Sequence, residues 1–268
     1  MSEPYVLETR NLIKEFKGFV AVNDVNLKIR QGDIHALIGP NGAGKTTVFN
    51  LLTKFLIPTR GQILYKGEDI TSLKSPAIAR KGIIRSFQIS AVFPHMTALE
   101  NIRVALQTAE GTSFSFWKSG NSLNKLNERS MELLESVGLA EYANTTTVEL
   151  AYGRKRALEL ATTLAMDPEL LLLDEPTQGM GSEDVDRVVE LVRKAAEGRT
   201  VLMVEHNLSV VSKLCDRITV LAQGAVLTEG DYQAVSADPQ VREVYMGSEG
   251  SGERGTAGAD GDNLEAAQ

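Results

Sequence analysis

The pattern of apolar and polar positions predicts a chain of mixed strands and helices. Residues 5–29 alternate apolar with polar side chains, which is typical of strands that bury one face. Residues 34–38 and 170–173 are continuously apolar, as expected for central strands of a parallel sheet that is covered on both faces. Further strand patterns lie at 62–70, 199–204, 218–221 and 225–227.

Helical spacing is clearest in three segments, 46–55, 127–138 and 155–166. The first places Val48, Leu51, Leu52 and Phe55 on one predicted apolar face. The second is closed by Gly138, as is common at the C-terminus of a helix. Residues 75–150 as a whole are predicted to form helices and loops, with a loop at 111–124. This order predicts an α/β fold with a helical insertion.

Composition narrows the class of protein. The 268 residues are 43% hydrophobic, enough for a sizeable core, and no apolar run is long enough to span a membrane. No signal segment is expected, and the single cysteine, Cys215, suits a reducing compartment. The formal net charge of −7 argues against binding to nucleic acid. Residues 248–268 are acidic, small and polar, and are expected to be a disordered tail.

The nine residues from Gly39 to Thr47 carry the clearest chemistry. They fit G-x-x-x-x-G-K-[ST] and lie between a predicted strand and a predicted helix, the context that a phosphate-binding loop needs. Side chains at Gly42 and Gly44 would block the approach of backbone N–H groups to phosphate oxygens. The following helix points its positive end at the same anion. The residues expected to bind nucleotide here are Gly39, Pro40, Asn41, Gly42, Ala43, Gly44, Lys45, Thr46 and Thr47.

Two carboxylates follow the apolar run 170–173. Asp174, at the tip of the predicted strand, is expected to hold Mg²⁺ beside the Thr46 hydroxyl. Glu175 lies one residue beyond and can act as the general base for an attacking water. Lys45 would offset charge on the β- and γ-phosphate oxygens. Together with the loop, these acids predict a nucleotide hydrolase.

Two further residues suit this site. Gln88 is the amide expected where the core meets the helical region, as a catalytic residue and a metal ligand. His206 follows the strand 199–204, and a neutral imidazole there can bind the γ-phosphate and hold the attacking water. His35 and His95 have no comparable context and are expected to be ordinary residues.

The order of these motifs resembles the ATP-binding cassette family, from about residue 5 to 247. The resemblance implies a P-loop core with a mainly parallel, RecA-like sheet, an N-terminal antiparallel β subdomain and an α-helical subdomain. Residues 1–247 would form the ATPase domain, with the helical subdomain at about 89–165. Phe16 would stack on the adenine of ATP, and Phe19 is the less favoured candidate.

The family's signature, usually Leu-Ser-Gly-Gly-Gln, here reads Leu150-Ala151-Tyr152-Gly153-Arg154. By resemblance, Leu150, Ala151, Tyr152 and Gly153 would contact a nucleotide that a second cassette holds. Ala151 lacks the serine hydroxyl, whose hydrogen bond to a charged group would be worth about 1.5–3 kcal/mol. Gly181 stands where the family often has an aspartate that links the two sites. These departures imply two ATP sites of unequal activity.

The Leu-Ala-Tyr-Gly signature, the segment 82–88 and the ending 244–247 are similar to the larger ATPase of branched-chain amino acid importers. The resemblance implies a peripheral subunit at the cytoplasmic face of the inner membrane. Its partners would be a second, different ATPase, two transmembrane permeases and, indirectly, a periplasmic substrate-binding protein. Importers of urea, amides or other amino acids share the pattern, and a lipid exporter is also open. Soluble cassette ATPases fit poorly, because residues 89–149 are too short for an inserted coiled coil.

Overall fold

The computed structural model describes residues 5–86, 92–109 and 120–249. Its strands are β1 (Tyr5–Phe16), β2 (Phe19–Val25), β3 (Lys28–Arg30), β4 (Ile34–Ile38), β5 (Arg60–Tyr65), β6 (Glu68–Asp69), β7 (Ile83–Ser86), β8 (Leu170–Asp174), β9 (Thr200–Val204), β10 (Arg217–Ala222) and β11 (Ala225–Gly230). Its helices are α1 (Lys45–Leu52), α2 (Ser75–Arg80), α3 (Ala98–Ala109), α4 (Gly120–Ser136), α5 (Tyr152–Leu164), α6 (Ser182–Ala196), α7 (Leu208–Leu214), α8 (Tyr232–Ala237) and α9 (Pro239–Glu249).

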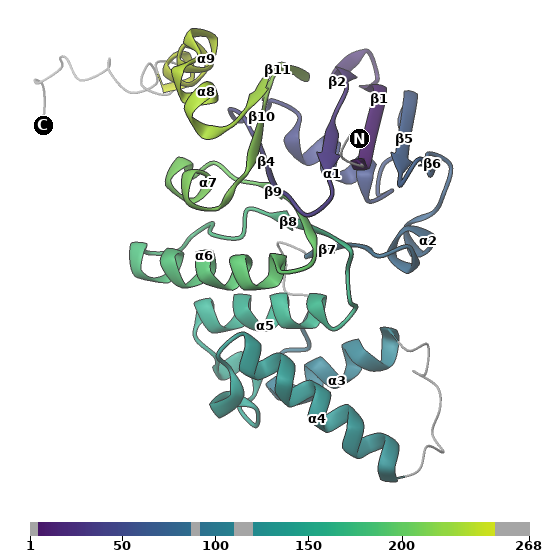
Figure 1. Ribbon diagram of the computed structural model, residues 1–268, viewed down its shortest axis with the longest axis vertical. Coiled ribbons are helices and arrows are strands. Elements are labelled where there is room, and N and C mark those ends of the chain that lie inside the picture. The colour runs from purple at the N-terminus through teal and green to yellow at the C-terminus, as the bar shows by residue number, and fades with distance from the viewer. Residues whose placement is uncertain (1–4, 87–91, 110–119, 250–268) are drawn as a thin grey trace, which may run out of the picture.

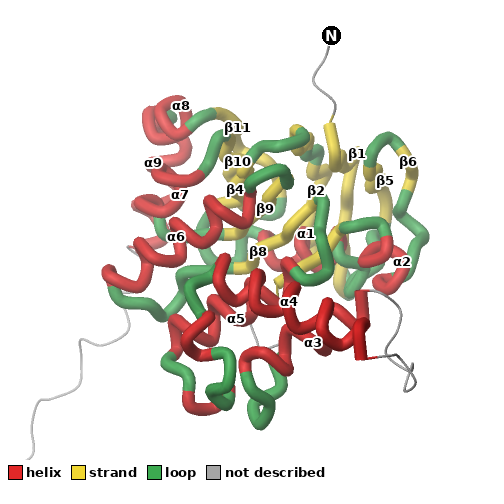
Figure 2. The backbone as a smooth tube through the Cα atoms, turned by 60° about the horizontal axis from the view of Figure 1, so that its bottom comes forward, coloured by secondary structure: helices red, strands yellow, loops and turns green. Residues whose placement is uncertain are grey.

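Two sheets organise the described part of the chain. The larger has six strands in the order β11-β10-β4-β9-β8-β7, parallel from β10 to β7, with β11 antiparallel at one edge. The smaller, built from β1, β2, β3, β5 and β6, is antiparallel throughout. Helices α3, α4 and α5 gather away from the antiparallel sheet (Figures 1 and 2). This arrangement confirms the predicted fold class.

Alternate residues of the parallel strands bury two different cores. Leu171 and Leu173 of β8 belong to the core that includes helices α3 to α7. Leu170 and Leu172 of the same strand face the other core, with α1 and the antiparallel sheet. Because successive side chains of a strand point to opposite faces, an apolar run buried on both sides produces this division. Helices α1 and α5 therefore lie on opposite faces of the sheet.

The structure corrects four boundaries. β7 is a strand inside a region predicted to hold only helices and loops, because its backbone pairs in parallel with β8. Helix α1 ends at Leu52, where Lys54 adopts a left-handed conformation (φ 61°), so Phe55 is exposed rather than on the buried face. Helix α4 begins at Gly120, so the predicted loop at 111–124 ends too late. The predicted disordered tail at 248–268 begins too early, because α9 continues to Glu249, and residues 250–268 lie outside the described residues.

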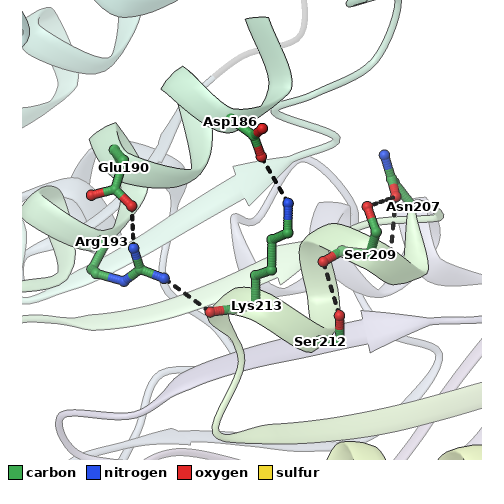
Figure 3. A network of polar contacts seen from close by, with 7 residues as sticks. All are labelled: Asp186, Glu190, Arg193, Asn207, Ser209, Ser212 and Lys213. Carbon is green, nitrogen blue, oxygen red and sulfur yellow. Dashed lines mark hydrogen bonds and ion pairs between the residues drawn. The ribbon is translucent and has the colours of Figure 1, made fainter. Parts of the chain in front are cut away.

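The helices that follow two strand ends of the parallel sheet are tied to each other. Lys213 of α7 donates to the Asp186 carboxylate of α6 at 2.7 Å, and Arg193 of α6 donates to the Lys213 carbonyl at 3.1 Å (Figure 3). Asn207 caps α7 by accepting a hydrogen bond from the Ser209 amide at 3.1 Å. These contacts fix α6 and α7 relative to one another.

None of the helices in the described residues combines the length and apolar character that a membrane span requires.

The burial pattern predicts how much a cavity in the core lowers the free energy of unfolding. Ile218 of β10 has no exposed surface, whereas Ile57 is 75% exposed. Replacing Ile218 with alanine should lower the free energy of unfolding by about 2–5 kcal/mol, since the substitution leaves a cavity. The matched change Ile57→Ala should alter it by less than about 0.5 kcal/mol. Urea unfolding followed by circular dichroism measures both, and equal losses would contradict the assigned core.

Candidate active site

The loop between β4 and α1 wraps around the start of the helix. Gly39, Gly42 and Gly44 have φ of +148°, +80° and +100°, a region that favours glycine. A Cβ at Gly39 would lie 2.1 Å from the Leu221 carbonyl oxygen, and a Cβ at Gly44 2.6 Å from that of Ala21. A Cβ at Gly42 would have no described atom within 4 Å apart from the adjacent residues, so there the backbone conformation alone requires glycine. The loop thus combines steric and conformational reasons for its glycines.

Lys45, the first residue of α1, folds its side chain back over this loop. Its ammonium donates to the carbonyl oxygens of Gly39 at 2.6 Å and Pro40 at 2.9 Å, and the residue is buried. Burial lowers the pKa of Lys45, and the negative charges of Glu175 and Asp174 oppose that shift. The interaction with both acids places the three charges at one edge of the sheet.

Asp174, the last residue of β8, forms a buried ion pair with Arg85 of β7. The two side chains are only 4% and 10% exposed. Arg85 also donates to the Asn50 side chain of α1 at 2.7 Å, and its guanidinium lies 5.7 Å from the ring centroid of Phe49. The guanidinium therefore joins the end of β8 to the helix that follows the glycine-rich loop. Sequence reasoning missed Arg85, because its role depends on the pairing of β7 with β8.

Glu175 and His206 come together at the ends of the neighbouring strands β8 and β9. The His206 Nδ1 lies 3.9 Å from a Glu175 carboxylate oxygen, which is longer than a hydrogen bond. Glu175 adopts a left-handed backbone (φ 47°), and its amide donates to the Val204 carbonyl at 2.9 Å. The sequence predicted both residues for one site, and the structure brings them together.

The segment 150–154 begins α5 on the opposite face of the sheet from α1. Ala151 is the residue before the helix, and no side-chain hydrogen bond caps it. The half-exposed Tyr152 donates from its hydroxyl to the Gln178 carbonyl oxygen at 3.2 Å. A groove of about 860 Å³ runs beside Ala151, Tyr152, Gly153 and Arg154 toward α6. The chain thus presents this segment on a separate surface from its own glycine-rich loop.

Phe16 and Phe19 are paired at the turn between β1 and β2, and both are exposed. The Lys14 ammonium lies 4.9 Å from the ring centroid of Phe16. Further along β2, Ala21 closely approaches Gly44 of the loop. The hairpin therefore lies beside the loop, and stacking of Phe16 on adenine stays a prediction.

The donors expected for Mg²⁺ suit a hard cation with few protein ligands. Thr46 is exposed at the first turn of α1, and the Asp174 carboxylate ends β8. Among the described residues, no three His, Cys, Asp or Glu side chains gather into a metal cluster. Magnesium commonly takes one or two carboxylates and fills its shell with phosphate and water oxygens, so this donor set fits it. Gln88, the other predicted ligand, lies outside the described residues.

Two residues without a predicted role lie away from this edge, His35 fully buried and Cys215 partly buried. His35 lies in the core, where burial lowers its pKa to about 4 and its Nε2 is 2.7 Å from the Thr219 hydroxyl. Burial raises the pKa of the Cys215 thiol to about 12, so the thiol is poorly reactive at neutral pH.

Family comparisons match most of the chain. The ABC transporter family model matches residues 22–178. A second model, of a branched-chain amino acid ATP-binding cassette transporter, matches residues 225–251. The solved ADP conformation of MJ1267, an ATP-binding cassette of an ABC transporter, superposes with a TM-score of 0.79 at 28% identity. That match covers 91% of this chain and 99% of the solved one.

Curated relatives extend over nearly the same length. The high-affinity branched-chain amino acid transport ATP-binding protein BraF of Pseudomonas aeruginosa is 41% identical over 92% of this chain and 99% of its own. LivG of Escherichia coli K12, described in the same words, is 39% identical with the same coverage. The lipopolysaccharide export system ATP-binding protein LptB of Acidithiobacillus ferridurans is 35% identical over 93% of this chain and 99% of its own.

The buried ion pair makes a prediction about stability. Arg85→Met should lower the free energy of unfolding by about 3–5 kcal/mol, because it leaves the buried Asp174 carboxylate without its partner. Arg129→Met removes an exposed arginine from its pair with Glu132 and should cost less than about 1 kcal/mol. Urea unfolding of the nucleotide-free protein compares the two. A loss for Arg85→Met as small as that for Arg129→Met would show that the pair contributes little.

Proposed function

Because the chain belongs to the ATP-binding cassette transporter family, we propose that it binds and hydrolyses ATP for an importer of branched-chain or related amino acids. The observation that carries the substrate class is the C-terminal match at residues 225–251. The relatives BraF and LivG, named for high-affinity branched-chain amino acid transport, support it over nearly the whole chain.

In this proposal the loop 39–47 binds the phosphates of ATP. Its backbone N–H groups and the α1 N-terminus face the anion, and Lys45 neutralises charge on the β- and γ-oxygens. Thr46, Asp174 and Gln88 would hold Mg²⁺, which supplies electrostatic stabilisation to the phosphates when bound. The Arg85 guanidinium holds the Asp174 carboxylate in place beside the loop.

Glu175 serves as the general base. It accepts a proton from the water that attacks the γ-phosphate, and its carboxylate lies next to His206 at the same sheet edge. His206 binds a γ-phosphate oxygen and helps to orient that water. Gln88 contributes to the same site from the segment that follows β7.

A second cassette completes each ATP site. The signature residues Leu150, Ala151, Tyr152 and Gly153 would face ATP bound to that partner, since α5 and α1 lie on opposite faces of the sheet. The partner is a different chain with the more usual signature. Ala151 and Gly181 make the two sites unequal, because one lacks a serine hydroxyl and a linking aspartate.

Permeases would dock on an apolar surface formed by Phe93, Met96 and Val148, which are all exposed. The Val148 amide donates to the Pro94 carbonyl at 3.0 Å, so the two segments lie side by side. The buried Asn101 side chain accepts from the Phe93 amide at 2.6 Å and donates to the Thr147 hydroxyl at 3.0 Å. This internal support gives the surface a fixed shape.

The helical region at about 89–165 would carry nucleotide-driven motion to these permeases. The chain would then lie at the cytoplasmic face of the inner membrane, with a periplasmic protein selecting the substrate.

Export of lipid is the second candidate, and LptB at 35% identity supports it. It is less favoured, because the C-terminal segment matches the branched-chain model and BraF and LivG are more similar. An importer of urea or amides would use the same ATP hydrolysis. Only the transported substrate would distinguish it from an importer of branched-chain amino acids.

If Glu175 is the general base, it is needed for ATP hydrolysis but not for ATP binding. Glu175→Gln should lower the rate of ATP hydrolysis by about 100-fold or more, because an amide cannot accept the proton. ATP binding should remain near that of the unmodified protein. Phosphate release by the assembled transporter and equilibrium binding of a fluorescent ATP analogue measure the two quantities.

Glu68→Gln, on the exposed end of β6, is the matched control and should leave both unchanged. Near-normal hydrolysis by Glu175→Gln would assign the base to another residue. ATP-driven uptake of labelled leucine by the unmodified transporter would support the substrate class, whereas uptake of urea alone would replace it.

The docking surface predicts a specific crosslink. Phe93→Cys should crosslink to a cytoplasmic loop of a permease, because Phe93 is half exposed on the proposed surface. Cys215, the one natural cysteine, should react poorly with the maleimide, because the residue is partly buried and burial raises the pKa of its thiol to about 12. Mass spectrometry after treatment with a bifunctional maleimide identifies the product. Tyr232→Cys on α8 is the control, and crosslinks from it alone would refute the docking surface.

A further inference from the structure

Glu205 is a charged side chain with no exposed surface, at the junction of two loops. Its Oε1 accepts hydrogen bonds from the Thr177 hydroxyl at 2.6 Å and the Thr177 amide at 3.1 Å. Its Oε2 accepts from the amides of His206 at 3.1 Å and Asn207 at 3.2 Å. One carboxylate oxygen thus binds the segment after Glu175, and the other binds the turn that carries His206.

We propose that Glu205 is a positioning residue that sets the distance between Glu175 and His206, and that it acts through these two loops without touching ATP. The inference rests on the proposed roles of Glu175 and His206 in hydrolysis. Those residues end neighbouring strands, but the sheet fixes only the strand ends and leaves the following loops to be positioned. The Glu205 carboxylate joins the loops at Thr177, two residues after Glu175, and at the amides of His206 and Asn207.

The backbone at Glu175 gives a reason for this support. A non-glycine residue at φ 47° is in an unfavourable backbone conformation, which persists only where neighbouring structure enforces it. The Glu175 carbonyl accepts from the Gln178 amide at 3.1 Å, which closes a turn over the same residues. Thr177, inside that turn, is anchored by both of its bonds to Glu205. The carboxylate thereby stabilises the strained conformation that directs the Glu175 side chain.

The same segment is held from its other side by the signature helix. The Tyr152 hydroxyl donates to the Gln178 carbonyl, one residue after Thr177. Helices α6 and α7, which begin after the two loops, are joined by the contacts of Asp186 and Arg193 with Lys213 (Figure 3). A shift of either loop therefore strains contacts on both sides of the Glu205 carboxylate.

The chemistry requires a carboxylate at this position. A carboxylate offers two acceptor oxygens, one for each loop, whereas a glutamine amide offers one oxygen and one NH₂ donor. In Glu205→Gln the NH₂ group must face one of the two loops, and the backbone amides of that loop lose their acceptor, even if the Thr177 hydroxyl turns to accept from the NH₂ group. Buried donors left without an acceptor are unfavourable, so the loop must move or admit water.

The closing experiment compares Glu205→Gln in the full chain and in the assembled transporter. We expect kcat for ATP hydrolysis to fall by roughly 10- to 100-fold, since a misplacement of about 1 Å can cost about 100-fold. KM should change by less than about twofold, because the phosphate loop is untouched. Hydrogen exchange should accelerate in at least one of the peptides that contain Thr177 or His206 and Asn207.

Matched variants separate positioning from general loss of stability. Glu229→Gln alters a partly buried carboxylate that, like Glu205, accepts from a threonine hydroxyl, Thr219 at 3.0 Å, and should leave kcat unchanged. Thr177→Val should lower kcat by part of the amount seen in Glu205→Gln, whereas Thr177→Ser, which keeps the hydroxyl, should leave kcat near that of the unmodified protein. The loss of kcat in the double variant Thr177→Val, Glu205→Gln should be smaller than the sum of the two single losses on a free-energy scale.

An unchanged kcat in Glu205→Gln with unchanged exchange in both peptides would overturn the inference. So would a loss of stability with kcat intact, which would make Glu205 merely structural. Absence of hydrolysis by the unmodified transporter would instead refute the proposed function, while the exchange measurement would still test the link between the loops.

Discussion

Parallel pairing of β4, β9 and β8 is the constraint on which the site depends. Ile34 to Leu37 pair with Val201 to Val204, and these pair in turn with Leu171 to Asp174, so three strands end at the same edge. Each end is followed by a segment with chemistry: the glycine-rich loop after β4, Glu175 after β8 and His206 after β9. Apolar side chains on both faces of these strands are buried only in this register. The pairing that packs the core therefore also aligns the segments of the site.

Charges at this edge are tolerated because each is bonded inside the protein. Lys45 donates to carbonyls of its own loop, Asp174 pairs with Arg85, and Glu205 accepts from two loops. A buried charge without such partners would be strongly unfavourable, so the fold must position these groups in order to exist. In the proposed mechanism the same bonds would also hold the reacting groups, so little reorganisation would be needed during the reaction.

Sequence patterns predicted the central strands, the glycine-rich loop and the pair of acids, because each depends on residues adjacent in the chain. They missed β7, whose four residues become a strand only through pairing with β8. They also placed Phe55 in the core, whereas a left-handed Lys54 ends α1 before that position. Arg85 and Glu205 had no local signal, since each joins its own segment to a distant one: Asp174 lies 89 residues from Arg85, and Thr177 lies 28 residues from Glu205. Periodicity reports which faces are buried, and it cannot report which distant polar groups meet there.

Two neighbouring residues of the segment 150–154, Ala151 and Tyr152, differ from the usual signature of the family. Ala151 leaves the start of α5 without a side-chain cap. The adjacent Tyr152 provides a contact that a glycine could not, to the Gln178 carbonyl in the segment that leads to Gly181. Gly181 has no side chain to form the proposed link across a dimer, whereas Tyr152 connects the start of α5 to the loop after Glu175 within the chain. The Tyr152 contact thus acts on the same segment that Thr177 anchors to Glu205.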